Sequence, residues 1–309
     1  MTNKPSRSID EQIALLKSRG MLFRDENAAK KILKSVSYYR LKGYWWDMQS
    51  DKQLHTFDPN SYFEEVVEKY EFDRELRLVL FYAIEIIEIA LRAKLIYHLS
   101  QSYGGLWYLD STLFDDMHLF EQQRNELQDE FARSGEIFVK DFKQKHPTIN
   151  ADPKIWENPE HPDAWLILEV ATFGNLSKMY KNLKHQLPQK AAIAKEFGLN
   201  FHNELSSWLE CISYLRNIVA HHSRVWSRTM VKTPMKVVNP NHPWLQMNLT
   251  KFQGKRPFHV ISTMLYLCNA VNPDNIFKQK LIDLFAKYPQ IPIYKLGFNN
   301  QWNQEDIWK

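Results

Sequence analysis

Glycine and cysteine are scarce in this chain, whose 309 residues include nine glycines and two cysteines. So few glycines argue against a loop-rich fold or a β-sandwich, because tight turns depend on glycine. The cysteines, Cys211 and Cys268, lie in apolar helical runs, so we expect buried free thiols instead of a disulfide or a metal site. The sequence also has no internal repeat, no Gly-rich nucleotide loop and no zinc-like spacing of cysteine and histidine. We therefore predict a protein without a cofactor or a bound metal.

Segments typical of export or of membrane insertion are missing as well. Residues 1–8 contain no apolar core of a signal peptide. The longest apolar stretch carries too many charges for a membrane span, at Glu85, Glu88, Arg92 and Lys94. We expect a soluble, cytoplasmic protein with no membrane partner.

Aromatic residues and a mild positive charge are what the chain does have. Ten Trp, fourteen Tyr and eighteen Phe, within a hydrophobic content of 44%, are enough for a large core and argue against disorder. The net charge of +4 and the pI near 8.8 permit an RNA partner without demanding one.

Helical periodicity runs through most of the sequence. Ser8 and Glu11 form a capping box that predicts a helix over residues 9–18, and a second helix is predicted from Asp25. From residue 60 to residue 100 the pattern predicts one very long helix, and its stretch over residues 72–99 is apolar on almost all sides and is therefore expected to be buried. We predict an all-α fold in which an N-terminal helical segment, residues 1–60, packs on a helical-bundle core with a C-terminal helical extension, residues 61–309.

The most informative stretch is the polar end of a helix predicted over residues 203–228, which contain no Gly or Pro. At about 100° per residue, one narrow stripe of this helix contains Asn217, His221, Arg224 and Arg228. The adjacent His222 falls on a mostly apolar face, so we expect it to be structural, although a rotation of the helix would exchange the two histidines. Arg216 lies about 140° round the helix from His221.

These residue types suit phosphodiester chemistry. A guanidinium binds phosphate oxygens in bidentate geometry, and an imidazole transfers protons near neutral pH. Arg216 could reach back towards His221 within one chain, or a second copy of the helix could complete the site across a two-fold axis. No metal is needed if the nucleophile is the 2′-hydroxyl of RNA itself. The spacing alone also fits a solvated basic face with one packed histidine.

The run from Arg216 to His221 resembles the Arg-polar-x-x-x-His signature of the HEPN superfamily. The longer run to Arg228 is similar to the Abi-like proteins, which are bacterial abortive-infection proteins within that superfamily. Three further segments resemble the same family, at residues 38–45, 72–77 and 173–177. The resemblance implies a HEPN-like helical bundle, usually dimeric, and in many members a metal-independent endoribonuclease activity.

The resemblance also implies roles for single residues. His221 would act as general base or acid in a cleavage that leaves a 2′,3′-cyclic phosphate. Arg216 would stabilise the charge on the phosphate, and Asn217 would position the imidazole or the ribose. Further basic residues could contact flanking phosphates of the RNA: Arg224, Arg228, Lys178 and Lys181.

A charged stripe crosses the long predicted helix. Its members fall within about 80° of one another and are Arg74, Arg77, Glu85, Glu88 and Arg92. Charges on a buried helix need partners, and Glu88 can pair with Arg92 four residues later. Two interpretations remain open. The stripe is an internal ladder of salt bridges, or Glu85 or Glu88 supports the site by orienting His221 or Arg216.

The expected function is that of an abortive-infection effector, which cleaves RNA and arrests the growth of a phage-infected cell. The expected partners are RNA, a second copy of the chain bound through the motif helix, and a regulatory small RNA or an antitoxin. Two other functions predict different behaviour. A non-catalytic RNA-binding protein would bind a small structured RNA without turnover, and a toxin–antitoxin interaction protein would lose assembly when Arg216 is replaced.

Overall fold

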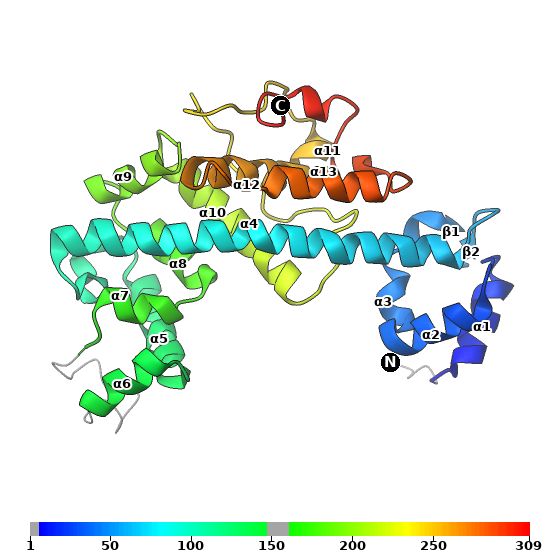
Figure 1. Ribbon diagram of the computed structural model, residues 1–309, viewed down its shortest axis with the longest axis horizontal. Helices are drawn as coiled ribbons and strands as arrows, with labels where there is room; N and C mark the ends of the chain where they lie inside the picture. The colour runs from blue at the N-terminus through cyan, green and yellow to red at the C-terminus, as the bar shows by residue number, and fades with distance from the viewer. Residues whose placement is uncertain (1–5, 147–160) are drawn as a thin grey trace.

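One long helix runs through the whole molecule (Figure 1). The computed structural model describes residues 6–146 and 161–309. Helix α4, Phe63–Tyr103, has 41 residues and is therefore about 60 Å long. Strands within the described residues are limited to a short antiparallel ribbon of β1, Gln49–Asp51, and β2, Thr56–Phe57. The prediction of an all-α fold is confirmed.

The N-terminal segment lies at the start of α4 (Figure 1). It consists of α1, Ile9–Ser18, α2, Glu26–Val36, α3, Tyr38–Lys42, and the 3-10 turn η1, Trp46–Met48, followed by the ribbon. The predicted capping box is confirmed, since the Ser8 hydroxyl accepts from the Glu11 N–H and the Ser8 N–H donates to the Glu11 carboxylate at 2.6 Å. Asp25 caps α2 through its side chain alone, which accepts a hydrogen bond from the Ala28 N–H. These signals act within one helical turn, so the local sequence predicts them well.

The remaining helices lie along α4 and at its far end (Figure 1). They are α5, Met117–Arg133, α6, Ile137–Lys145, α7, Ala164–Ile167, α8, Phe173–Asn182, α9, Pro188–Glu196, α10, His202–Ala220, α11, Lys251–Gly254, α12, Pro257–Val271, and α13, Phe277–Lys287, with 3-10 turns η2, Trp107–Leu109, η3, Ser111–Leu113, η6, Leu168–Val170, η7, Ile293–Leu296, and η8, Trp302–Gln304. Helix α10 contacts α4, α8, α9 and α12, which places the motif helix inside the bundle. Both cysteines are buried free thiols, as predicted.

Helix α4 is not buried on all sides, so that expectation is wrong. Leu78, Ile89 and Tyr97 are 66%, 54% and 63% exposed. An apolar composition cannot tell which faces the surrounding helices will cover, and here they leave one strip of α4 open. Within residues 6–146 and 161–309, no helix is long and apolar enough to cross a membrane.

The motif helix ends earlier than the sequence predicts. Helix α10 ends at Ala220, and the prediction of one helix to Arg228 is wrong. His222 adopts a left-handed backbone with a φ of 53°. The two residues after the helix cap donate their N–H groups to the carbonyls of Val219 and Ile218, each at 2.9 Å. This Schellman motif usually has glycine at its left-handed position, so a sequence without Gly or Pro gives no local sign of the end.

Candidate functional site

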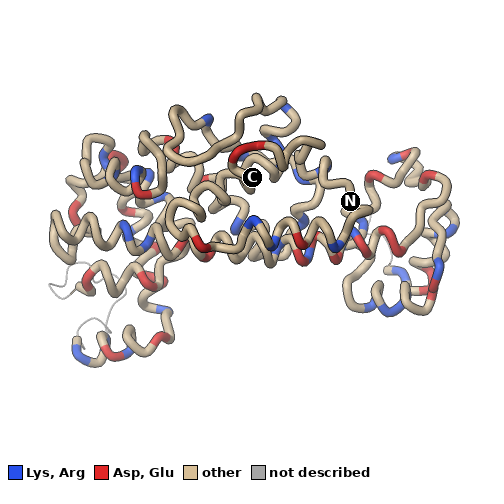
Figure 2. The backbone as a smooth tube through the Cα atoms, turned by 45° about the horizontal axis from the view of Figure 1, so that its top comes forward, with Lys and Arg blue, Asp and Glu red and all other residues tan. Residues whose placement is uncertain are grey.

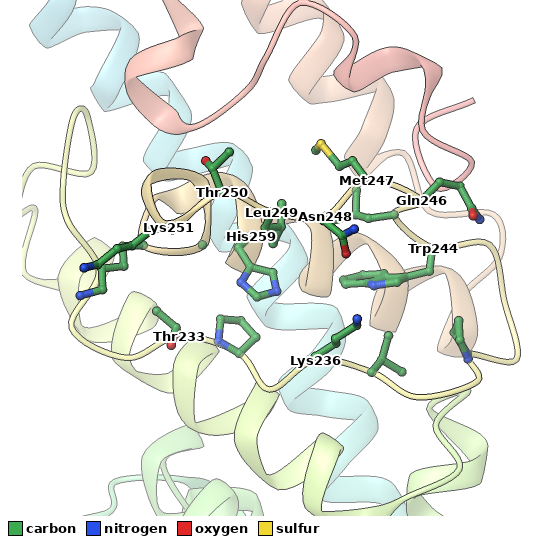
Figure 3. A pocket seen from close by; sticks show the side chains of 16 residues that line it. Thr233, Lys236, Trp244, Gln246, Met247, Asn248, Leu249, Thr250, Lys251 and His259 are labelled. Atoms are coloured by element: carbon green, nitrogen blue, oxygen red, sulfur yellow. The ribbon is translucent and has the colours of Figure 1, made fainter.

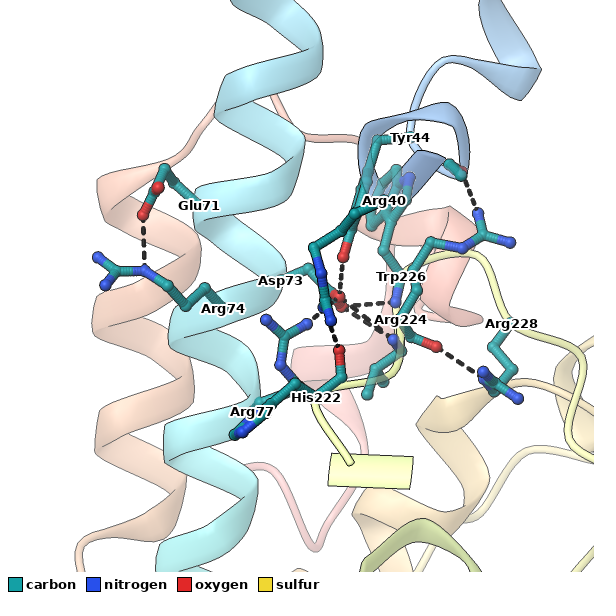
Figure 4. Close-up of polar contacts among 12 residues, drawn as sticks. Arg40, Tyr44, Glu71, Asp73, Arg74, Arg77, His222, Arg224, Trp226 and Arg228 are labelled. Carbon is teal, nitrogen blue, oxygen red and sulfur yellow. Dashed lines mark hydrogen bonds and ion pairs between the residues drawn. The ribbon is translucent and has the colours of Figure 1, made fainter. Parts of the chain in front are cut away.

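The segment that follows α10 is held by one buried carboxylate, that of Asp73 in α4 (Figure 4). Its oxygens accept hydrogen bonds from the backbone N–H groups of Trp226 at 2.6 Å and Val225 at 3.1 Å. The Tyr44 hydroxyl donates to it at 2.6 Å, and Arg77, one turn along α4, pairs with it at 2.5 Å. Three parts of the chain are thereby fastened at one point: the N-terminal segment, the long helix and the segment after α10.

Each group around Asp73 is a hydrogen-bond donor. Burial raises the pKa of Tyr44, so its hydroxyl keeps the proton that it donates. A carboxylate can accept about four hydrogen bonds, and the donors around Asp73 match that capacity. Sequence reasoning misses this residue. The signal that could have found it is an Asp four residues before an Arg in a stretch that is otherwise apolar.

Arg224 and Arg228 leave the polar stripe because the helix ends before them. The Arg224 guanidinium donates to the Gly43 carbonyl at 2.6 Å, and Arg228 donates to the Arg224 carbonyl at 2.7 Å (Figure 4). Gly43 lies so close that a Cβ there would be 3.4 Å from the Arg224 side chain. The prediction that these arginines share a helical stripe with His221 is wrong. Both instead form part of the connection between the segment after α10 and the N-terminal segment.

His221 and His222 are both exposed at the end of α10. His221 is the C-cap residue, and the carbonyl of His222 accepts a hydrogen bond from Arg40 at 2.8 Å (Figure 4). The prediction that His222 packs on an apolar face is wrong, because the chain has already left the helix there. Burial therefore does not distinguish the two imidazoles, and the choice of His221 rests on its spacing from Arg216.

Arg216 and Asn217 border a polar groove between α10, α8 and α5, with a volume of about 560 Å³. Lys178 and Lys181 line the same groove, so the structure brings these four predicted residues together. His221 is not among the residues that line it. The residues proposed for chemistry and for RNA contact are thus divided between a groove and the end of the helix beside it.

The lysines of the groove are paired with carboxylates. Lys178 lies 3.3 Å from Glu126, Lys181 lies 2.8 Å from Glu210, and Lys232 lies 2.5 Å from the same Glu210. Acidic and basic positions are interspersed in this way along much of the chain (Figure 2). An incoming phosphate would have to compete with these carboxylates, which reduces what each lysine can contribute to binding.

The Arg216 guanidinium is in a different state from these lysines. Its Nε atom is buried and has no hydrogen-bond partner among the described residues. Its charge interacts with Glu88 of α4. An arginine with unused donors can bind phosphate oxygens in bidentate geometry without first breaking a hydrogen bond of its own. Arg216 is therefore the strongest candidate phosphate ligand of the groove.

Glu88 and Arg92 form the ion pair that their spacing predicts, at 3.2 Å. Arg92 also donates to the carbonyls of Leu168 at 2.9 Å and Ala171 at 3.1 Å, which fixes the turn before α8. Glu85 is exposed. Glu88 is thus the carboxylate of the stripe that acts on Arg216. In the described part of the chain, no three His, Cys, Asp or Glu side chains are grouped so that they could hold a metal ion.

Replacing Glu88 by glutamine removes a charge that acts on the Arg216 guanidinium, and the effect on phosphate chemistry at Arg216 is expected to be about tenfold or less, because water partly screens this interaction. Burial raises the pKa of Glu88. The contribution of Glu88 to stability is therefore fully present below the unfolded-state pKa of this group and is lost as pH rises through its folded-state pKa. Glutamine does not ionise, so the Glu88→Gln variant is not subject to this loss of stability. It should be as stable as wild type or more stable at neutral pH, and the difference should vanish in acid.

Urea denaturation at several pH values measures this difference, and the exposed Glu85→Gln is the matched control. A Glu88→Gln variant with unchanged activity and unchanged stability at every pH would remove Glu88 from the site.

These features define a class of protein. It is an all-helical bundle in which helix α10 carries an arginine with unused donors beside an open groove. An exposed histidine lies at the end of the same helix. The sequence pattern of the Abi-like protein family matches residues 31–227, more than half of the chain, so the chain belongs to this family. The match includes Asp73, Arg216 and His221. No curated protein and no solved structure matches the chain.

Proposed function

We propose that this protein is a metal-independent endoribonuclease of the HEPN type and that it acts as an abortive-infection effector against phage. The observation that carries the proposal is the state of Arg216. Its guanidinium has a buried Nε without a hydrogen-bond partner among the described residues and borders an open groove beside Asn217. The exposed His221 follows at the end of the same helix. Family membership supports a role in abortive infection.

In the proposed reaction, the 2′-hydroxyl oxygen of RNA attacks the adjacent phosphorus and the bond to the 5′-oxygen of the next nucleotide breaks. His221 accepts the proton of the 2′-hydroxyl or donates a proton to the leaving 5′-oxygen. Arg216 stabilises the negative charge that develops on the phosphate oxygens. Asn217 positions the imidazole or the ribose. The products are a 2′,3′-cyclic phosphate and a 5′-hydroxyl end.

We also propose that a second copy of the chain completes this site. Arg216 borders the groove beside α8, whereas His221 lies at the helix end and does not line the groove. A two-fold dimer through the end of α10 would bring the Arg216 of one chain near the His221 of its partner. A regulator would then have to keep the enzyme inactive in an uninfected cell, and for this role we propose a small RNA or an antitoxin.

The test is an RNA-cleavage assay on the purified protein with EDTA present, together with light scattering for its mass. The expected result is a dimer whose product carries a 2′,3′-cyclic phosphate. Arg216→Ala should lose cleavage at least about a hundredfold, because it removes charge stabilisation from the transition state, and should keep the dimer mass.

Salt-sensitive RNA binding without turnover by the wild type would contradict the proposed activity and favour an RNA-binding protein. Loss of the dimer in Arg216→Ala would favour an interaction protein.

A further inference from the structure

A second pocket lies on another part of the molecule, between the segment of residues 233–255 and helix α12 (Figure 3). Its volume is about 610 Å³, within the range of about 300–1,000 Å³ that is usual for sites of small organic ligands. Its lining residues begin at Thr233, whereas the family pattern ends at residue 227. The pocket is therefore a feature of this chain outside the part that matches the family.

The wall of the pocket is an irregular segment that is fastened at several points. Its backbone N–H groups at Met235 and Val238 donate to Ser207 at 2.9 Å and to Glu204 at 2.6 Å, both in α10. Further along, the N–H of Gln246 donates to Glu305 at 2.5 Å. These contacts come from both sides of the segment and hold it in one conformation. A ligand would enter a preformed pocket and would lose little energy in ordering it.

The charge of the pocket is positive. Three lysines line it, Lys236, Lys251 and Lys255, and no Asp or Glu does. All three are exposed, and none forms an ion pair within the described part of the chain. The lysines of the Arg216 groove differ in this respect, since carboxylates neutralise them. The pocket therefore favours an anion of two or three charges.

An aromatic wall stands at one end of the pocket, formed by the partly exposed Trp244 (Figure 3). Its indole stacks on Trp208 of α10, with ring centroids 5.0 Å apart and planes at 27°, and meets Tyr266 of α12 edge to face at 5.5 Å. These two neighbours fix the position of the indole. A fixed, partly exposed indole is a suitable surface for a planar ring.

His259 of α12 lies in the middle of the pocket (Figure 3). It is 8% exposed, and its Nδ1 atom has no hydrogen-bond partner among the described residues. Burial lowers its pKa to about 4, so the ring is neutral at neutral pH, and it hydrogen-bonds the backbone of Gly254. Because a carbonyl accepts, the ring proton is on the other nitrogen, and Nδ1 is left as an unused acceptor. A ligand with an N–H or O–H group would satisfy it.

We propose that this pocket binds a small organic anion that combines a planar ring, a hydrogen-bond donor and a phosphate, which is the chemistry of a nucleoside monophosphate. The ring lies against Trp244, an amine or hydroxyl group donates to Nδ1 of His259, and the phosphate is bound by the lysines. The pocket contains neither Arg216 nor His221, so this site is independent of the proposed RNA-cleavage site.

Isothermal titration calorimetry of the full-length protein with AMP, GMP, CMP and UMP tests the proposal. At least one of them should bind with one ligand per chain. Ribose 5-phosphate lacks the planar base, and the parent nucleoside lacks the phosphate. Each should therefore bind at least about tenfold more weakly, a difference of about 1.4 kcal/mol. Failure of all four nucleotides to bind, or equal binding of ribose 5-phosphate, would overturn the proposal.

A charge-matched pair of variants locates the site. The triple variant Lys236→Gln, Lys251→Gln, Lys255→Gln should weaken binding at least about tenfold, with its melting temperature unchanged because the three side chains are exposed. The control triple variant Lys31→Gln, Lys52→Gln, Lys140→Gln removes the same charge from exposed positions elsewhere and should bind like wild type. An equal loss in both variants, or a loss in Arg216→Ala instead, would show that the nucleotide binds elsewhere.

Discussion

His221→Ala is expected to reduce the rate of RNA cleavage by about 10²- to 10⁴-fold, the range usual for the loss of a general acid or base. His222→Ala should cleave RNA at close to the wild-type rate. The two imidazoles are adjacent and both exposed, so the second variant is a close control for any general effect of removing a histidine from this turn. The measurement is single-turnover cleavage in EDTA, with the cyclic-phosphate end of the product quantified.

The exposure of both histidines determines what each outcome would mean. Neither histidine side chain is buried, so both variants should fold, and a lost activity would report on chemistry. If only His222→Ala lost RNA cleavage, His222 instead of His221 would be the general acid or base. Full activity in both variants would place the chemistry outside this turn and would contradict the proposed mechanism.

Asp73→Ala is expected to reduce the free energy of unfolding by about 3–5 kcal/mol, the effect usual for removing one partner of a buried ion pair. The variant would leave the buried Arg77 without its carboxylate, and the Tyr44 hydroxyl and the backbone N–H groups of Val225 and Trp226 without their acceptor. Urea denaturation followed by circular dichroism measures the change.

A control lies on the same helix, two residues before Asp73. Glu71 pairs with Arg74 at 2.7 Å on the exposed side of α4 (Figure 4). Glu71→Ala should change the free energy of unfolding by less than about 1 kcal/mol, because water screens an exposed pair. Similar losses in the two variants would mean that burial of Asp73 adds nothing, and would contradict its role as the point that fastens the segment after α10.

Features that are set by neighbouring residues follow from the sequence. The caps at Ser8 and Asp25 lie where they were predicted, because a cap is made by groups within a few residues of one another. The pairing of Glu88 with Arg92 follows from the spacing of one helical turn. That Arg216 and Asn217 line one groove with Lys178, by contrast, is a finding of the structure.

Local reasoning fails where a distant residue decides the conformation. The motif helix ends at Ala220 although no Gly or Pro follows, and the chain beyond it is bound by Asp73, about 150 positions earlier in the sequence. The Arg224 guanidinium donates to the carbonyl of Gly43, which lies 181 positions away in the sequence. A helical wheel assumes that the helix continues. It therefore assigned His222 and Arg224 to faces of α10, although both residues lie beyond the end of that helix.

The sequence by itself determined the helical class, the family and the residue types that could bind a phosphate and move a proton. Periodicity, caps and motif spacing are short-range properties, and they are written in consecutive residues. Only the tertiary structure decided where α10 ends, that Arg216 keeps unused donors while the lysines beside it are paired, and that a second, positively charged pocket surrounds His259. Each of these depends on side chains brought together from distant parts of the chain, which no local pattern encodes.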